Sequence, residues 1–160
     1  MGKKRGQRYQ EGTWFAVPLS NGGFAVGVVA RTDGRGIVFG YFFGPQTAEP
    51  VALKETENLG PERAIWKAQF GDLGLIKGAW PIIGLDENWT RAKWPLVEFY
   101  RTDSISGAVT KVTYSDSLSE VSKTPVAAQE ATGRCRDSLS GSGSIEYVLS
   151  DLLGPSVGYS

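Results

Sequence analysis

Three apolar and aromatic runs, separated by short turns rich in glycine, open the chain and constrain its fold more than any other feature. The runs cover residues 13–19, 24–30 and 37–43, and the turns between them contain Ser-Asn-Gly-Gly and Asp-Gly-Arg-Gly. Runs of this length with such turns between them predict antiparallel strands joined as hairpins. The third run, IVFGYFF, is apolar on both faces, so we expect both of its faces to be covered. The sequence therefore predicts a three-stranded meander.

Further strands are predicted downstream by period-two alternation and turn residues. They cover residues 64–70, 80–84, 96–101 and 108–114, with Pro81 marking an edge or a bulge. Gly27, in the middle of the second run, predicts a bulge or bend that curls the sheet. We expect a mainly β, α+β fold, a curled antiparallel sheet or an SH3-like, partly open barrel of about 6–7 short strands.

The C-terminal part combines a polar segment with a helical pattern. We expect residues 115–144, rich in Ser, Thr, Ala and Gly, to be polar and flexible. An amphipathic helix is predicted over residues 145–153, with Ser144 as N-cap and Gly154-Pro155 as the stop. Its apolar stripe consists of Ile145, Val148, Leu149, Leu152 and Leu153. We expect this stripe to dock on the sheet rather than on a partner.

The chain length fits one domain. We expect a single domain over residues 12–160, preceded by a basic flexible tail over residues 1–11. The start is basic and no apolar stretch follows it, so we expect no secretory signal. No run approaches the roughly 20 apolar residues of a membrane span. With a single cysteine, which suits a reducing compartment, these features predict a cytoplasmic protein with no membrane partner.

Missing residue types exclude much catalytic chemistry. The chain has no histidine and one cysteine, Cys135, so catalytic triads, Cys-His pairs, zinc sites that use His or several thiolates, and internal disulfides are all excluded. Cys135 lies between two arginines but has no base or partner thiol, which favours a bystander thiol. Carboxylates in the loops are expected to be solvated. We predict no enzyme, no catalytic or metal-binding residues and no cofactor.

Net charge is zero overall, with 17 basic and 17 acidic residues, which points neither to nucleic acid nor to an anionic membrane. The four basic residues among the first ten leave thirteen against seventeen acidic ones, a net charge of −4 from residue 11 onward. A mildly acidic body is suited to a basic partner such as a nuclease.

Two segments together resemble a known family. EGTWFAVPLSNGGFAVGVV carries a Gly-x-x-Phe-x-(Ile/Val)-Pro-Leu strand, a turn with glycine and a Phe-x-x-Gly-x-Val strand, while KGAWPIIG carries Gly-x-Trp-x-(Ile/Val)-Ile-Gly. The matching positions are Gly12, Phe15, Val17, Pro18, Leu19, Gly23, Phe24, Gly27, Val29, Gly78, Trp80, Ile82, Ile83 and Gly84. In order and spacing, over residues 11–101, they resemble the immunity protein 26 family of bacterial polymorphic toxin systems.

The resemblance implies a non-enzymatic protein that binds a toxin made by the same or a neighbouring cell and blocks it in the cytoplasm. Most matching residues are turn glycines or apolar strand residues, which specify the fold, so toxin contacts are expected on the loops. We therefore predict an immunity protein that binds and neutralises a cognate toxin by protein–protein interaction, as a monomer and without a nucleic-acid partner.

The candidate partner-binding residues lie mainly in the polar stretch after residue 85. They are Asp86, Glu87, Trp89 and Trp94, with Tyr41 and Tyr100 as additions. Aromatic side chains on loops are favoured interface anchors. The alternative, that both tryptophans cap the ends of the barrel, is equally compatible with the sequence.

Two other classes of function stay open at this point. A small barrel with exposed aromatics and a basic tail could be a binding module for nucleic acid or peptide, recognised by binding to mixed DNA or RNA that falls steeply with salt. An enzyme that uses carboxylates alone would need a close Asp/Glu pair with a raised pKa in a cleft.

Overall fold

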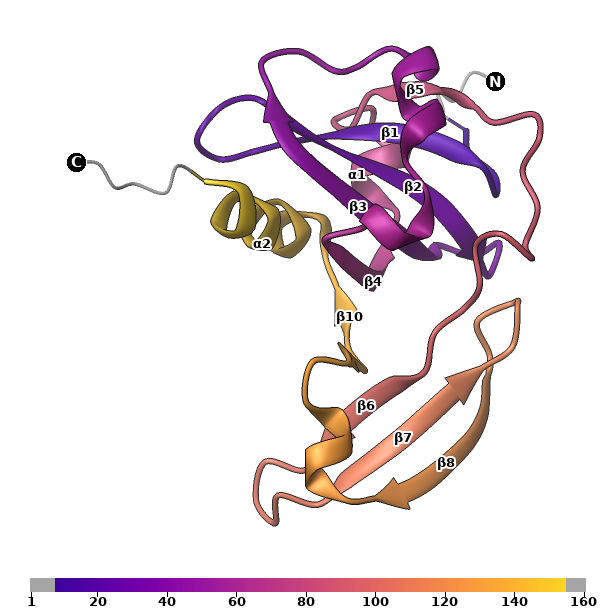
Figure 1. Ribbon diagram of the computed structural model, residues 1–160, viewed down its shortest axis with the longest axis vertical. Coiled ribbons are helices and arrows are strands. Elements are labelled where there is room, and N and C mark those ends of the chain that lie inside the picture. Colours follow the sequence, from indigo (N-terminus) through magenta and orange to yellow (C-terminus); the bar gives the residue numbers. More distant parts are fainter. Residues whose placement is uncertain (1–7, 155–160) are drawn as a thin grey trace.

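The protein consists of two β-sheets and a C-terminal helix that packs on the first of them (Figure 1). This computed structural model describes residues 8–154, within which the chain forms ten strands. The first seven residues of the predicted tail, and Pro155 of the predicted helix stop, lie outside the described residues. Residues 8–11 lie against the domain: the Tyr9 hydroxyl donates a hydrogen bond of 2.7 Å to Asp72.

The first sheet has the strand order β10-β4-β3-β2-β1-β5. Its strands are β1 (Thr13–Pro18), β2 (Phe24–Thr32), β3 (Ile37–Thr47), β4 (Trp66–Gly71), β5 (Ile82–Leu85) and β10 (Leu139–Ser140). Neighbouring strands are antiparallel except β10, which is parallel to β4. The predicted meander is confirmed, and β5, which follows Pro81, is an edge strand as expected.

The second sheet has the strand order β8-β7-β6-β9. Its strands are β6 (Phe99–Thr102), β7 (Val109–Tyr114), β8 (Glu120–Val126) and β9 (Cys135–Arg136). The helices are η1 (Leu53–Asn58), η2 (Pro61–Arg63), α1 (Leu73–Ile76), η3 (Ala128–Ala131) and α2 (Ser142–Leu153). The mainly β fold with a C-terminal helix is confirmed, and among the described residues neither sheet closes into a barrel.

Residues 115–144, expected to be polar and flexible, contain β8, η3, β9 and β10. β8 is almost entirely exposed on both faces, and β9 and β10 have two residues each. Such strands bury too few apolar side chains to leave an alternating pattern in the sequence. The chain therefore contains more strands than the sequence predicts.

Gly27 does not form the predicted bulge. It pairs in regular register with Phe15 on β1 and Phe42 on β3, and the register breaks between β2 and β3 lie nearer the ends of β2. A Cβ atom at Gly27 would lie 2.6 Å from the Phe15 ring and 3.0 Å from the Phe42 ring. The glycine therefore makes room for two buried aromatic rings.

The first sheet has a hydrophobic core on each face. One core contains Phe15, Phe42, Phe70 and Trp80, together with Ile145 and Leu149 of α2. The other contains Trp14, Phe39, Tyr41, Phe43, Trp94 and Phe99, the last of these from the second sheet. Both faces of β3 are thus covered, as its apolar sequence predicts.

Helix α2 docks on the sheet as predicted, but it begins earlier than expected. Gly141, not Ser144, is the N-cap, and the Ile145 amide donates a hydrogen bond of 3.0 Å to the Gly141 carbonyl, which closes the first turn. The prediction of Ser144 as N-cap was wrong. It assumed that a side chain caps the helix, whereas no side-chain hydrogen bond caps the observed start at Gly141. Leu149 is fully buried, whereas Leu152 is 51% exposed.

The chain crosses between the sheets twice. Residues 86–98 lead from β5 to β6, and residues 137 and 138 lead from β9 back to β10 (Figure 1). Phe99 of β6 also packs edge-on against Phe39 of β3, with ring centroids 5.7 Å apart. The sheets are therefore joined by covalent crossings and by side chains. Among the described residues, no helix has the length and apolar character that a bilayer crossing requires.

Candidate interaction surface

The segment between β5 and β6 is held in place by backbone hydrogen bonds. We call residues 86–95 the tryptophan loop. The Asp86 amide donates to the Gly12 carbonyl (2.9 Å), and the Trp89 amide donates to the Asp86 carbonyl (3.2 Å). The Asp86 carboxylate accepts a further hydrogen bond from the Asn88 amide (2.8 Å). These bonds fix the start of the loop against the strand entry at Gly12.

The two tryptophans form the inner layer of this loop. Trp94 is 1% exposed and packs edge-on against Trp14 and Tyr41, with ring centroids 5.8 and 5.0 Å away. Trp89 is partly buried and stacks on Trp94, with centroids 5.1 Å apart and ring planes 14° apart. A Cβ atom at Gly12, whose φ is +91°, would lie 3.0 Å from the Trp89 Cβ. The stacked pair therefore packs the loop against the first sheet.

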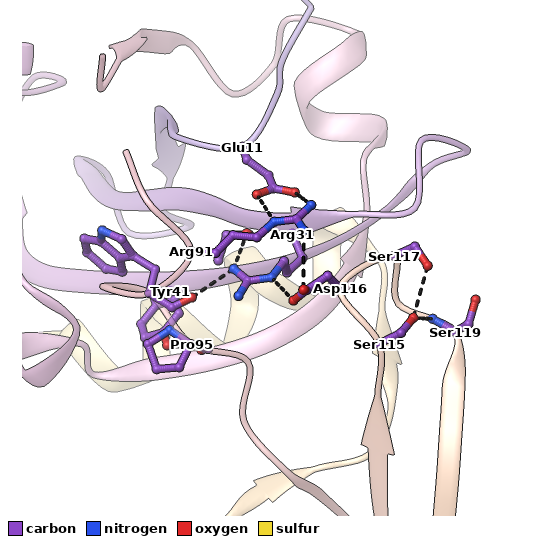
Figure 2. Close-up of polar contacts among 11 residues, drawn as sticks. Glu11, Arg31, Tyr41, Arg91, Pro95, Ser115, Asp116, Ser117 and Ser119 are labelled. Atoms are coloured by element: carbon purple, nitrogen blue, oxygen red, sulfur yellow. Dashed lines mark hydrogen bonds and ion pairs between the residues drawn. The ribbon is translucent and has the colours of Figure 1, made fainter. Parts of the chain in front are cut away.

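A network of four charged side chains fixes the base of the loop (Figure 2). Arg31, at the end of β2, is 3% exposed and donates from Nε to Asp116 Oδ1 (2.7 Å) and from Nη1 to the carbonyls of Trp94 (2.9 Å) and Ala30 (2.7 Å). These bonds satisfy a buried guanidinium, which would otherwise be costly to bury.

Arg91 extends the network from the loop itself. Its Nε and Nη2 donate to the two carboxylate oxygens of Glu11 (2.9 and 2.8 Å), and its Nη1 lies 3.3 Å from Asp116 Oδ2. The network therefore connects the entry to β1, the end of β2, the tryptophan loop and the turn between β7 and β8. Figure 2 shows both arginines reaching Asp116.

Hydrogen bonds and burial shift the pKa values of three groups at the base of the loop. The hydrogen bond from Arg31 is the main reason that the pKa of Asp116 is lowered. The hydrogen bond to Glu11 raises the pKa of Arg91. Burial raises the pKa of Tyr41 to about 12, and its hydroxyl donates to the Pro95 carbonyl. Asp116 and Arg91 therefore keep their charges, and Tyr41 its proton, at neutral pH.

The structure brings five of the six sequence-predicted partner residues together. Asp86, Glu87, Trp89 and Trp94 share the loop, and Tyr41 contacts Trp94 from β3. Tyr100 instead lies in β6 of the second sheet, where Arg134 covers its ring. Trp94, Tyr41 and Tyr100 are buried within the domain, at 1%, 1% and 5% exposure. In this conformation they offer a partner almost no surface, whereas Glu87 is exposed.

Sequence reasoning missed the side chains that hold the loop. Arg31 at the end of an apolar run is an unusual residue for a buried strand and could have signalled a buried ion pair. Nothing in the sequence indicates that Asp116, 85 residues later, is its partner. Sequence reasoning also did not name four exposed polar residues of the loop as candidate contact residues. They are Asn88, Thr90, Arg91 and Lys93.

The described residues show little that would support metal or thiol chemistry. Within residues 8–154, no group of three or more His, Cys, Asp or Glu side chains is placed to hold a metal ion. Burial raises the pKa of the Cys135 thiol, which favours the less nucleophilic protonated form. The arrangement at the tryptophan loop presents a fixed, polar surface, which is suited to binding another macromolecule.

Comparison with known proteins identifies a family. Residues 10–110 match the family described as immunity protein 26. No curated protein and no solved structure matches the chain. The matched region contains β1–β6, the tryptophan loop and the start of β7, and Asp116, β8–β10 and α2 follow it. Since the match covers more than half of the 160 residues, the resemblance seen in the sequence is confirmed and the chain belongs to the immunity protein 26 family.

Proposed function

We propose that this immunity protein neutralises a cognate toxin by binding it directly, and that the tryptophan loop forms the contact surface. The observation that carries the proposal is the set of contacts at this loop: stacked tryptophans, the Arg31–Asp116 pair and the Arg91–Glu11 pair hold it, while Glu87, Asn88, Thr90 and Lys93 are exposed. A surface fixed before binding loses little conformational entropy in the complex.

The charged loop residues define the chemistry of the partner. Asp86, which is partly buried, and Glu87, which is exposed, follow one another at the start of the loop, and exposed Lys93 places a positive charge near its end. Complementary charges on a toxin would speed association and fix the orientation of the complex. We expect lysine or arginine side chains of the toxin to face Asp86 and Glu87.

The proposal includes action in the cytoplasm as a monomer. A single thiol, Cys135, is compatible with a reducing compartment. The free edge of β8 carries Lys123 and Pro125, residues that disfavour pairing between sheet edges. Neither feature requires a membrane, a nucleic acid or a second copy of the chain.

The first experiment co-expresses the protein with the product of the adjacent reading frame and asks whether the two co-purify. A stable complex then allows titration calorimetry with loop variants. Glu87→Lys and Lys93→Glu are expected to weaken affinity by about tenfold each, the effect of roughly 1.4 kcal/mol. Both side chains are exposed, so the variants should remain folded.

The matched control is Asp151→Lys, a charge reversal of the same size on an exposed residue of α2. Figure 1 shows α2 and the segment after β5 on opposite sides of the first sheet. Affinity equal to that of the unaltered protein in the double variant Glu87→Lys, Lys93→Glu would remove the loop from the interface. Absence of any complex with a neighbouring toxin would remove direct binding itself.

A further inference from the structure

A pocket of about 320 Å³ opens on the second sheet, and no residue of the tryptophan loop lines it. It is lined by two residues of β6, by the segment around β9 and by η3: Tyr100, Thr102, Ala131, Arg134, Cys135 and Arg136. The segment from η3 to β9 follows the region that matches the family, so this pocket depends on residues outside that match.

The strand pairing explains why the polar groups meet. Tyr100 and Thr102 are two residues apart on β6, so their side chains project from the same face. Arg136 pairs with Tyr100 in the parallel ladder of β6 and β9, which places it beside Tyr100. The Arg134 guanidinium lies 5.7 Å from the centre of the Tyr100 ring. This cation–π contact holds one guanidinium beside a ring that lines the pocket.

The two arginines of the pocket differ in their ion pairing from three other arginines in or next to the second sheet. Arg31, Arg91 and Arg101 each pair with a carboxylate. Arg134 and Arg136 form no ion pair with any residue in the range 8–154.

Two acidic side chains close to the pocket already have partners. Asp137 accepts hydrogen bonds from Arg101 (2.5 Å) and Tyr114 (2.5 Å). Glu98 lies 3.6 Å from the Lys111 ammonium and accepts a long hydrogen bond from the Tyr100 hydroxyl (3.5 Å). The positive charge of Arg134 and Arg136 is therefore not balanced by these carboxylates.

We propose that this pocket binds an oxyanion group, a carboxylate or a phosphate, between the guanidiniums of Arg134 and Arg136. Guanidinium groups match the geometry of both oxyanions and donate pairs of charge-assisted hydrogen bonds to them. Thr102 also lines the pocket, and its hydroxyl offers another donor. The site does not depend on the tryptophan loop, and its test needs no toxin.

The experiment titrates the ¹⁵N-labelled protein with inorganic phosphate and, separately, with acetate, at low ionic strength. Chemical shifts of the backbone amides and of the arginine Nε–H groups are followed. We expect saturable shifts confined to the residues that line the pocket, with a dissociation constant of order 1 mM for the better ligand. Tighter binding of phosphate identifies a phosphate group as the natural ligand, and tighter binding of acetate identifies an acidic side chain or chain terminus.

Variants separate the pocket from general attraction of anions to arginine. Arg134→Gln combined with Arg136→Gln should weaken binding at least about tenfold, because both charge-assisted contacts are lost. Both residues are exposed, and a circular dichroism spectrum checks the fold. Arg63→Gln, on the exposed helix η2, is the matched control and should bind as the unaltered protein does.

Two results would overturn the proposal. One is the absence of a saturable shift with either anion. The other is binding that does not need the pocket arginines. It would appear as unchanged shifts in the double variant or as shifts of equal size at Arg63, and would mean that anions collect at any exposed arginine.

Discussion

At the scale of single residues, Arg31 links the two sheets through a buried charge. It is buried, and its charge is met by two carbonyl oxygens of the first sheet and its loop and by one carboxylate of the second sheet. Within residues 8–154, Asp116 is the one carboxylate that pairs with this buried guanidinium, so its removal leaves the charge poorly compensated. Asp116 therefore has a larger effect on stability than its half-exposed position suggests.

The Arg31–Asp116 pair predicts a dependence of stability on pH. The pKa of Asp116 is lowered in the folded protein, so the pair stabilises the fold fully above the ordinary value of 3.8. This stabilisation is lost as the pH falls through the lower pKa of the folded state. Between about pH 5 and pH 2, chemical denaturation should show a steeper loss of unfolding free energy for the unaltered protein than for Asp116→Asn.

At pH 7 the same variant should be less stable by about 1 kcal/mol, since water screens a half-exposed carboxylate. The control is Asp151→Asn, which removes an exposed carboxylate of α2 that makes no ion pair in the part of the chain the structure describes. Its stability profile should follow that of the unaltered protein. Parallel profiles for Asp116→Asn and the unaltered protein would contradict the prediction.

Residue types were easier to predict than residue environments. The sequence identified the loop that contains Trp89 and Trp94, but the depth of Trp94 depends on Trp14 of β1 and on Tyr41 and Phe43 of β3. Contacts between residues so far apart in sequence leave no local pattern. The role of Gly27 could not be predicted for the same reason, since it depends on two rings from neighbouring strands.

At the scale of elements, β8 shows how an edge strand is protected. Two backbone hydrogen bonds show which way the backbone groups of β6 and β7 point. The Asp103 amide donates to the Ala108 carbonyl, so these two residues face each other, and the Tyr100 carbonyl accepts from the Asp137 amide, so Tyr100 faces away from β7. Backbone groups alternate in direction along a strand, so Val109, Lys111 and Thr113 of β7 face β8. Their partners on β8 face β7 in turn, which directs the backbone of Lys123 and Pro125 to the free edge.

Proline lacks an amide hydrogen, so Pro125 removes one donor from this free edge. Pro125→Thr would restore a backbone amide donor at the free edge of β8 and place a residue of high β propensity there. We expect this variant to self-associate in a concentration-dependent manner, measured by sedimentation velocity, while its unfolding free energy changes by less than about 1 kcal/mol. Ser122→Thr, whose backbone groups face β7, is the control and should remain monomeric. A monomeric Pro125→Thr would show that other features protect the edge.

Elements with a strong apolar pattern were predicted, and elements without one were not. The meander and helix α2 bury apolar faces, which produce periods of two and of three to four residues. β8 buries almost nothing, so its sequence resembles a loop. The short strands β9 and β10 form because longer strands already present edges to them, a cause that lies elsewhere in the chain.

At the scale of the whole molecule, the two sheets should unfold together. Phe99 packs on Phe39, Arg31 pairs with Asp116, and the chain crosses between the sheets twice. Loss of one sheet would expose the core face that the other covers, so partial unfolding is expected to be unfavourable.

The chain offers a separate probe for each sheet. All five tryptophans come before β6, so their fluorescence reports on the first sheet and its loop, whereas Cys135 is half-buried in the second sheet. We expect the fluorescence midpoint in urea to coincide with the midpoint at which Cys135 becomes reactive to a thiol reagent. Reaction of Cys135 at clearly lower urea would show that the second sheet opens independently.

The path of the chain also has a consequence for the timing of synthesis. Ile145 and Leu149, which complete the first core, follow the whole second sheet in sequence. A ribosome that has released β1–β5 has therefore exposed an unfinished apolar surface, and this surface stays uncovered until more than fifty further residues have emerged. The first core can therefore be completed only after the residues up to Leu149 have been translated, however early the tryptophan loop has formed.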